Sequence, residues 1–349
     1  MNFKKILVVQ TSFLGDTILT LPLIKSIKKS FPDAVVFCLT IPQNGGVFSG
    51  NKDISGIITY DKHGKENGIS GFIRKLKEIK QEHFDVLISA HRSMRTSLLV
   101  LFSHIPLRIG FSDSAMPFVY NRIVKRDLHI HEVERNLSLL NPLNIGKEKW
   151  SYDAELYYPE EAKAFCGNIF EAYGVRTELK IGINPFSIWP TKKWPKERFK
   201  ALAKRITDEL HGRVFVCGME RDKEEASFIK GDNERIINLA GKTKLKELFC
   251  LISQMDVFIT NDSGPMHIAC AYNVPTVAIF GPTVPEFGFS PWGKRCTVVE
   301  RKGLKCRPCG KHGNFRCREG HFKCMLDISV DEVFVAMKRF VDENTRHSF

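Results

Sequence analysis

The sequence predicts an α/β protein built from two doubly wound parallel sheets, and three observations lead to this prediction. Apolar runs typical of buried strands alternate with amphipathic helical segments. This alternation starts at the first residues and starts again near residue 180. The chain of 349 residues is also longer than a single hydrophobic core usually supports, and its length suits two domains. Strands and helices in such alternation form parallel sheets with helices over both faces.

The first half contains three expected strands and three expected helices. The strands are expected at residues 5–10, 34–40 and 84–90, and the helices at residues 16–31, 71–83 and 131–145. The third helix closes this half.

The second half repeats the pattern. Strands are expected at residues 181–186, 213–218, 235–241 and 256–262, and helices at residues 196–210, 222–230 and 244–255, with a further helix from Pro265. We place the boundary near residues 172–180, which predicts one domain at residues 1–172 and another at residues 173–349.

Composition and charge limit the classes of protein to which the chain can belong. Its 43% hydrophobic and 26% charged residues are typical of globular proteins. No apolar run approaches the ~20 residues of a membrane span, and the short apolar run at the start predicts a strand, not a signal peptide. Ten cysteines without a secretory signal favour the reducing cytoplasm. The net charge of +13 fits anionic partners, or simply a lysine-rich surface.

Two nucleotide-binding motifs are excluded. The first strand is followed by "TSFLGD", which lacks the glycine spacing of a dinucleotide site. The stretch "AGKT" resembles the end of a P-loop, but Ile236 occupies the position of the required first glycine.

The stretch "NDSGPMHIACA" places a polar turn between a buried strand and a helix. Pro265 suits the first helical turn, with Ser263 or Gly264 as the cap. The free N–H groups at this helix start form an anion site, with Asp262 at the strand end and His267 in the first turn. The alternative is a well-capped helix with no ligand.

The stretch "NPFSIWPTKKWPKERF" fills a second loop between a strand and a helix. Ser187, Thr191, Lys192 and Lys193 supply hydroxyl and ammonium groups that suit a diphosphate. We expect Trp194 to hold the loop against the helix. The alternative is a solvated lysine pair.

The third polar turn lies in "QTSFLGDTILTLP", directly after the first strand. Asp16 is here either a helix cap or a general base for an incoming hydroxyl group.

Together, these three turns resemble the family 9 glycosyltransferases, the heptosyltransferases of lipopolysaccharide inner-core synthesis. The resemblance extends over nearly the whole chain and includes "SFLGDTILTLPLI", "IPLRIGF", "HEVERNLSLL", "KKWPKERFKALA" and "CGMERDKEEA".

The resemblance implies the GT-B fold, in which two Rossmann-like domains face each other across a cleft. The first domain would bind the acceptor and the second the nucleotide sugar, and the last helix is a candidate to pack back on the first domain. The implied reaction inverts the sugar carbon without a metal or other cofactor. The implied partners are ADP-heptose and an anionic glycolipid of the lipid A–Kdo type at the inner membrane face, with no nucleic acid. The alternative is another nucleotide sugar or another glycan acceptor.

The resemblance also assigns roles to single residues. Asp16 matches the general base, Lys192 the lysine that stabilises the departing diphosphate, and Glu220 the acid that binds the ribose. The further donor-binding residues that the resemblance implies are Ser187, Thr243, Asp262, Ser263, Gly264 and His267.

A cysteine-rich segment, "CRPCGKHGNFRCREGHFKC", leaves several possibilities open. Its candidate metal ligands are Cys306, Cys309, Cys317 and Cys324, with His312 and His321 between them. The spacing suits a closed structural zinc site, free thiols or disulfides. A zinc knuckle that binds nucleic acid is a distant alternative function. It would explain the charge but would leave the three polar turns unused.

Overall fold

The structure, a computed structural model, describes residues 3–346 and divides the chain into two compact units. The first unit is Met1–Tyr157 and the second is Tyr158–Phe349. Helix α7 (Glu160–Ala172) belongs to the second unit because it packs against α10 (Leu245–Ser253). The division therefore precedes α7, whereas the sequence placed the boundary after this segment.

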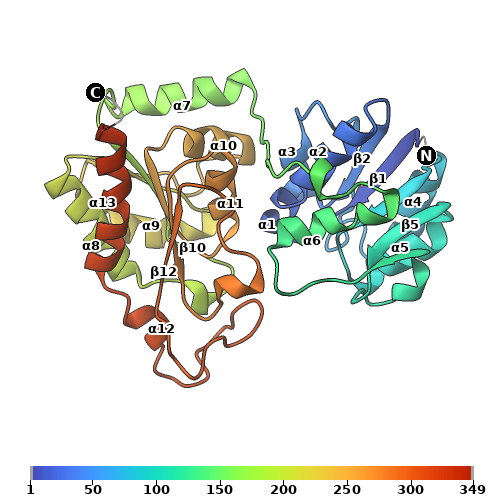
Figure 1. The fold of residues 1–349 in the computed structure, drawn as a ribbon. Helices are drawn as coiled ribbons and strands as arrows, with labels where there is room; N and C mark the ends of the chain where they lie inside the picture. Colours follow the sequence, from blue (N-terminus) through green and yellow to red (C-terminus); the bar gives the residue numbers. More distant parts are fainter. Residues whose placement is uncertain (1–2, 347–349) are drawn as a thin grey trace. The chain divides into compact units, whose positions relative to one another are not determined.

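The first unit is built on a parallel sheet in the order β3-β2-β1-β4-β5-β6 (Figure 1). Its strands are β1 (Lys5–Val9), β2 (Val35–Thr40), β3 (Gly56–Thr59), β4 (Val86–Ser89), β5 (Leu107–Phe111) and β6 (Arg122–Val124). Its helices are α1 (Leu14–Ile18), α2 (Leu21–Ser30), α3 (Gly45–Phe48), α4 (Gly68–Gln81), α5 (Met94–Ser103) and α6 (Glu132–Ser138), with short 3-10 turns η1 (Pro42–Asn44), η2 (Pro117–Val119), η3 (Asn141–Leu143) and η4 (Lys147–Lys149).

Two helices expected in this unit are interrupted. The segment at residues 16–31 forms α1 and α2, with Pro22 in the first turn of α2. The segment at residues 131–145 is helical only to Ser138 and continues into η3, which contains Pro142. Proline lacks the N–H group that a continuous helix needs, so each helix breaks near it.

The second unit repeats the same topology, in the order β12-β11-β10-β7-β8-β9. Its strands are β7 (Lys180–Asn184), β8 (Arg213–Val216), β9 (Ile236–Asn238), β10 (Val257–Asn261), β11 (Thr276–Phe280) and β12 (Cys296–Glu300). Its remaining helices are α8 (Lys196–Glu209), α9 (Lys223–Lys230), α11 (Gly264–Ala271), α12 (Lys323–Leu326) and α13 (Val330–Arg346), with 3-10 turns η5 (Pro190–Lys192), η6 (Glu220–Asp222) and η7 (Pro285–Phe287). The predicted pair of doubly wound parallel sheets is therefore confirmed.

Helices cover both faces of the second sheet, which is buried between them. Figure 1 shows α8 and α13 on one side of β10 and β12, and α10 and α11 on the other. The final helix, α13, packs against α8 and against β10, β11 and β12 of its own unit. Among the described residues, no helix is both long and apolar enough to cross a membrane.

Candidate active site

Polar residues follow the strands of the second sheet at its carboxyl edge. Ser187 follows β7, Glu220 follows β8, Thr243 follows β9 and Asp262 directly follows β10. Strands β7 and β10 are neighbours whose connections run in opposite directions along the sheet. This is the switch point at which ligands of open parallel sheets bind.

The central contact at this edge is an ion pair between the first two polar turns, those of Asp262 and Lys192. The Nζ atom of Lys192 lies 2.6 Å from Oδ2 of Asp262, and each side chain is only about one-tenth exposed. The hydroxyl group of Thr283, which follows β11, donates to the same oxygen at 2.7 Å. Asp262 therefore fixes the ammonium group of Lys192 at the end of β10.

The start of α11 lies beside this ion pair. Ser263 is the N-cap residue and Pro265 lies in the first turn, as the sequence predicted. The Ser263 hydroxyl does not cap the helix but instead accepts a hydrogen bond from Asn184 Nδ2 at 3.1 Å. His267 is buried in the first turn. The first N–H groups of α11 therefore have no side-chain cap from Ser263.

The loop that carries Lys192 is anchored to the core by its neighbour, Trp194. The Trp194 ring is fully buried, and its Nε1 atom donates to the Ile328 carbonyl at 3.0 Å. Its backbone N–H donates to Oδ1 of Asn261, the last residue of β10, at 3.1 Å. The ring also meets Phe199 of α8 edge to face, with centroids 4.9 Å apart, which confirms that Trp194 holds the loop against this helix. Together these contacts hold Lys192 close to Asp262.

The cysteine-rich segment braces both loops of the site. Oγ1 of Thr191 donates to the Asn314 carbonyl at 2.7 Å and accepts from the Asn314 N–H at 2.7 Å. The Arg307 guanidinium donates to the carbonyls of Gly281 and Thr283, at 2.6 and 2.7 Å. This segment therefore supports Lys192 from one side and the end of β11 from the other.

The cysteines of this segment are free thiols in the structure. Cys306 Sγ lies 3.7 Å from Nε2 of His321, and Cys309 donates to the Cys306 carbonyl at 2.9 Å. Burial raises the pKa of the Cys324 thiol to about 11, and the neighbouring thiols add to the rise. Within residues 3–346, no group of three or more His, Cys, Asp or Glu side chains is arranged to hold a metal ion. The zinc hypothesis for these four cysteines stays a prediction.

Glu220 and Thr243 lie farther along the same edge of the sheet. Gly241 has φ +72°, and a Cβ atom there would lie 2.3 Å from Oε2 of Glu220. The loop containing Thr243 therefore passes directly beside Glu220. The Glu220 side chain is exposed and pairs with Lys223 at 2.5 Å, so its carboxylate faces solvent.

Asp16 occupies the equivalent edge of the first sheet, after β1. Phe13 is the N-cap of α1, so Asp16 lies within the first turn and is not the N-cap residue. Burial raises the pKa of Asp16 to about 6, and the nearby Glu132 carboxylate adds to the rise. The Ser12 hydroxyl donates a hydrogen bond to Oδ2 of Asp16 at 3.0 Å. This hydrogen bond opposes the rise in the pKa of Asp16. A carboxylate with a raised pKa at a switch point is suited to accept a proton.

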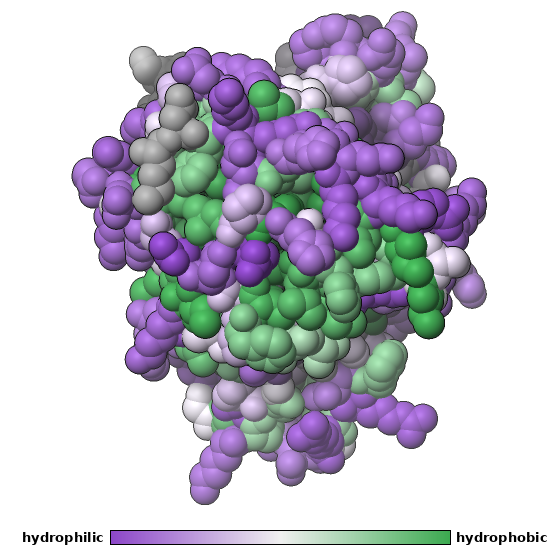
Figure 2. All heavy atoms as spheres, turned by 90° about the vertical axis from the view of Figure 1, so that its right-hand side faces the viewer, coloured by the Kyte–Doolittle hydropathy of each residue, from purple (hydrophilic) through white to green (hydrophobic). Residues whose placement is uncertain are grey.

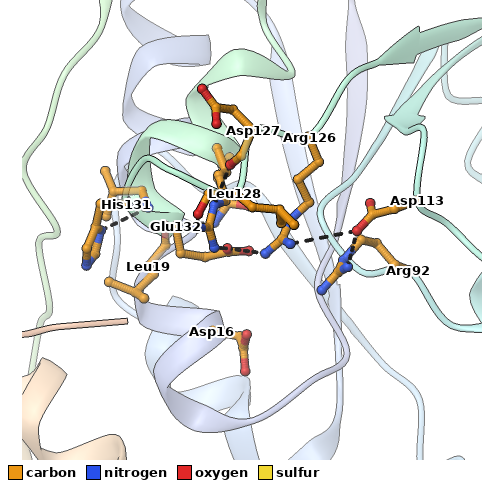
Figure 3. Close-up of polar contacts among 12 residues, drawn as sticks. Asp16, Leu19, Arg92, Asp113, Arg126, Asp127, Leu128, His131 and Glu132 are labelled. Atoms are coloured by element: carbon orange, nitrogen blue, oxygen red, sulfur yellow. Dashed lines mark hydrogen bonds and ion pairs between the residues drawn. The ribbon is translucent and has the colours of Figure 1, made fainter. Parts of the chain in front are cut away.

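Glu132 forms a buried ion triad near Asp16. Its Oε2 atom accepts hydrogen bonds from Arg126 at 2.5 Å and from Arg135 at 2.9 Å. Arg135 also binds the carbonyls of Asp127 and Leu128, which ties down the loop before α6. Figure 3 shows the Asp16 side chain across from Glu132, with the line of ion pairs leading from Glu132 through Arg126 toward Asp113.

A second polar group follows β4, the strand next to β1. Burial lowers the pKa of His91 to about 3, so the imidazole is neutral at physiological pH. Its Nδ1 atom lies 3.0 Å from Oγ1 of Thr11. Lys62 donates to the Thr11 carbonyl at 2.8 Å, and Arg95 donates to the Lys62 carbonyl at 2.7 Å. Lysine and arginine side chains therefore gather near the edge that carries Asp16.

Sequence reasoning identified the polar turns but missed several of their partners. Thr283 stands in "FGPT" after a buried strand, and His91 follows "VLISA", so the strand-end rule could have found both. Glu132 gave no such signal, because its burial and its two arginine partners come from tertiary contacts.

Comparisons with known proteins identify relatives over almost the whole chain. The sequence matches the profile of glycosyltransferase family 9 (heptosyltransferase) over residues 72–317. Lipooligosaccharide heptosyltransferase 2 of Campylobacter jejuni is 28% identical over 342 residues, covering 97% of this chain and 98% of that protein. Lipopolysaccharide heptosyltransferase 2 of Escherichia coli is 28% identical over 352 residues, covering 94% and 96%.

Solved structures share the fold over almost the whole chain. A family 9 glycosyl transferase from Veillonella parvula superimposes with a TM-score of 0.85 at 27% identity, covering 98% of both chains. The ADP-heptose lps heptosyltransferase II of E. coli gives a TM-score of 0.78 at 23% identity, covering 98% of this chain and 99% of that one. Since the family profile spans well over half of the sequence, the chain belongs to glycosyltransferase family 9, the heptosyltransferases.

Proposed function

We propose that this glycosyltransferase transfers heptose from ADP-heptose to the inner core of lipopolysaccharide, with inversion at the sugar carbon and without a metal ion. The names of the relatives support the sugar and the acceptor. A solved heptosyltransferase of the same fold is described with ADP-2-deoxy-2-fluoro heptose. The observation that carries the proposal is the pairing of Lys192 with Asp262 beside the start of α11.

The reaction is a single displacement. The acceptor hydroxyl oxygen attacks the anomeric carbon of the donor while the bond from that carbon to the diphosphate oxygen breaks. Attack from the face opposite the leaving group inverts the configuration. Asp16 accepts the hydroxyl proton, for which its raised pKa near 6 is suited because the carboxylate is still ionised at neutral pH.

Negative charge grows on the diphosphate as it departs, and this charge must be stabilised. Lys192 supplies an ammonium group, and the start of α11 supplies N–H groups and the positive end of a helix dipole. In this proposal Asp262, Thr283 and Asn184 act on the donor through the groups that they position. Gly264 and His267 complete the turn around the diphosphate and sugar.

The nucleoside portion extends toward β8 and β9. Glu220 is exposed at the end of β8 and can accept hydrogen bonds from ribose hydroxyl groups. Ser187 and Thr243 line the adjacent loops and offer further hydroxyl contacts. In this proposal the second unit binds the donor.

The first unit binds the acceptor in this proposal. Lys62, Arg92 and Arg95 lie near the edge that carries Asp16, and these cations suit an anionic glycolipid. Because lipid A is anchored in a membrane, the enzyme must meet its acceptor at the inner membrane face.

One assay tests the donor, the acceptor and the metal together. The enzyme is incubated with ADP-heptose and a panel of truncated core acceptors, and product formation and anomeric configuration are measured. We expect one acceptor to be extended with inversion, and turnover to continue in EDTA. Transfer only from another nucleotide sugar would replace the donor assignment. Loss of turnover in EDTA, with an unchanged circular dichroism spectrum, would contradict the metal-free mechanism.

A further inference from the structure

Helix α5 carries apolar side chains on both of its faces, and Arg95 is its one charged residue. Its inner face contributes Leu99 and Val100 to the core of the first unit. Its outer face carries Met94, Leu98 and Leu101 at helical spacing, and Met94 and Leu101 are exposed. A helix that is apolar all round is normally buried, whereas a surface helix carries polar residues outward. The outer face of α5 therefore carries fewer polar residues than the solvent-facing side of an ordinary surface helix.

The apolar side chains of neighbouring elements extend this face. Phe102 on α5 and Phe72 on α4 form an edge-to-face ring contact with centroids 6.4 Å apart, which places the two helices side by side. Ile69 on α4 is 79% exposed, and Phe118 on η2, which also contacts α5, is 72% exposed. We name the following set the α5 surface: Ile69, Ile73, Met94, Leu101, Phe102 and Phe118. Figure 2 looks onto the side of the molecule on which α4 and α5 lie, and shows apolar side chains gathered between hydrophilic ones.

The charge beside the α5 surface is positive. Arg74 and Lys77 on α4 are exposed and form no ion pair with any described residue. The two nearby carboxylates share one buried lysine: Lys75 lies 3.4 Å from Glu66 and 2.5 Å from Glu78. One negative charge therefore remains against the exposed cations Arg74, Lys77 and Lys80. The outer surface of α4 therefore presents a net positive charge next to exposed apolar side chains.

We infer that the α5 surface binds an anionic phospholipid bilayer. Exposed apolar side chains enter the boundary between headgroups and acyl chains, and neighbouring lysine and arginine residues bind anionic headgroups. A second copy of the chain is a poor occupant, because a symmetric contact would bring Arg74 and Lys77 close to the same cations of the other copy. The inference rests on the proposed function, in which the acceptor is a membrane lipid, and it assigns the membrane contact to one face of the first unit.

Sedimentation with lipid vesicles tests this inference without turnover. The parent enzyme should bind vesicles that contain phosphatidylglycerol, and much less those of phosphatidylcholine alone. Ile69→Ser with Phe118→Ser should weaken binding at least about tenfold, because both side chains are exposed and would enter the bilayer. Arg74→Gln with Lys77→Gln should weaken it about tenfold at low salt and less at high salt.

A matched control comes from the second unit, where Leu326 and Val335 are also exposed apolar residues. Leu326→Ser with Val335→Ser should leave vesicle binding unchanged. In the Ile69/Phe118 variant, the melting temperature should be unchanged, so a folding defect would be recognised. Turnover of a detergent-dispersed acceptor should also be unchanged, so a failed active-site assignment would be recognised separately. Equal vesicle binding by parent and Ile69/Phe118 variant would overturn the inference. So would a concentration-dependent dimer of the parent that this variant abolishes.

Discussion

The two units share one topology, yet the carboxylates at their switch points have opposite surroundings. Asp262 follows an inner strand of the second sheet and pairs directly with Lys192. Asp16 follows an inner strand of the first sheet and has Ser12 and the Glu132 carboxylate nearby. The arginines of that region bind Glu132.

This difference shows that burial and neighbouring charges, and not the position in the fold alone, decide what a carboxylate can do. A carboxylate paired with a lysine serves as an anchor for that cation. A carboxylate that is desolvated beside another carboxylate has a raised pKa and is suited to take up a proton. We therefore expect substitutions at the two edges to produce different kinetic changes.

The largest expected effect is at Asp16. Asp16→Asn keeps the size of the side chain but removes the proton acceptor, so turnover should fall roughly 10²- to 10⁴-fold with ADP binding intact. Turnover within about tenfold of the parent would end the assignment of Asp16 as the base.

The melting temperature of the same variant separates a base from a structural residue. A raised pKa means that the folded chain binds the Asp16 proton more tightly than the unfolded chain does. The resulting stabilisation is present below the ordinary pKa of aspartate and is lost as the pH rises through about 6. At pH 8, Asp16→Asn should therefore melt at the same temperature as the parent or higher. A lower melting temperature at pH 8 would indicate that the carboxylate stabilises α1.

The next largest effect is expected at Lys192. Lys192→Ala removes a charge-assisted contact worth about 1.5–3 kcal/mol, so kcat/KM for the donor should fall roughly 10- to 150-fold. Lys193→Ala is the matched control, because the adjacent lysine pairs with Glu225 at 3.1 Å instead. Asp262→Ala should weaken donor use in the same direction as Lys192→Ala, because it frees the ammonium group from its anchor. Similar losses for Lys192→Ala and Lys193→Ala would contradict the proposed diphosphate site.

The pH dependence of kcat/KM should reflect Asp16 at the edge of the first sheet, and not the residues at the edge of the second sheet. In the parent, kcat/KM should fall as the pH drops through about 6, where Asp16 becomes protonated. Glu132→Gln removes a negative neighbour, so this acid limb should move to lower pH. The control Glu134→Gln, on the same helix, should leave the limb in place. Glu132→Gln should also lower the melting temperature, because two arginines lose a buried partner. An unmoved acid limb in a folded Glu132→Gln enzyme would show that Glu132 does not influence the base.

The smallest expected effect is at Thr283, which touches the site only through Asp262. Thr283→Val removes one hydrogen bond to the anchor, worth about 0.5–1.5 kcal/mol, so donor affinity should fall roughly two- to tenfold. Calorimetric titration with ADP measures this directly. A loss larger than that of Lys192→Ala would mean that Thr283 contacts the donor itself.

The sequence alone determined the architecture and the positions of the polar turns. The periodicity of apolar residues along the chain predicts strands and helices. Polar residues at the carboxyl ends of parallel strands lie at the same edge of the sheet. For this reason Asp16, Lys192 and the turn at Ser263 could be named before any contact was known. The same periodicity located most elements. It also predicted helices that continue past Pro22 and Pro142, whereas the structure shows a break near each proline.

Only the tertiary structure decided which of these groups face one another. Lys192 and Asp262 are 70 residues apart in sequence, and their contact depends on the packing of Trp194 behind them. The burial of Glu132 between two arginines, the bracing of both loops by the cysteine-rich segment and the exposed outer face of α5 likewise have no local signature. Burial and neighbouring charges depend on side chains that folding brings together from distant parts of the sequence. Periodicity and spacing along the chain therefore do not reveal them.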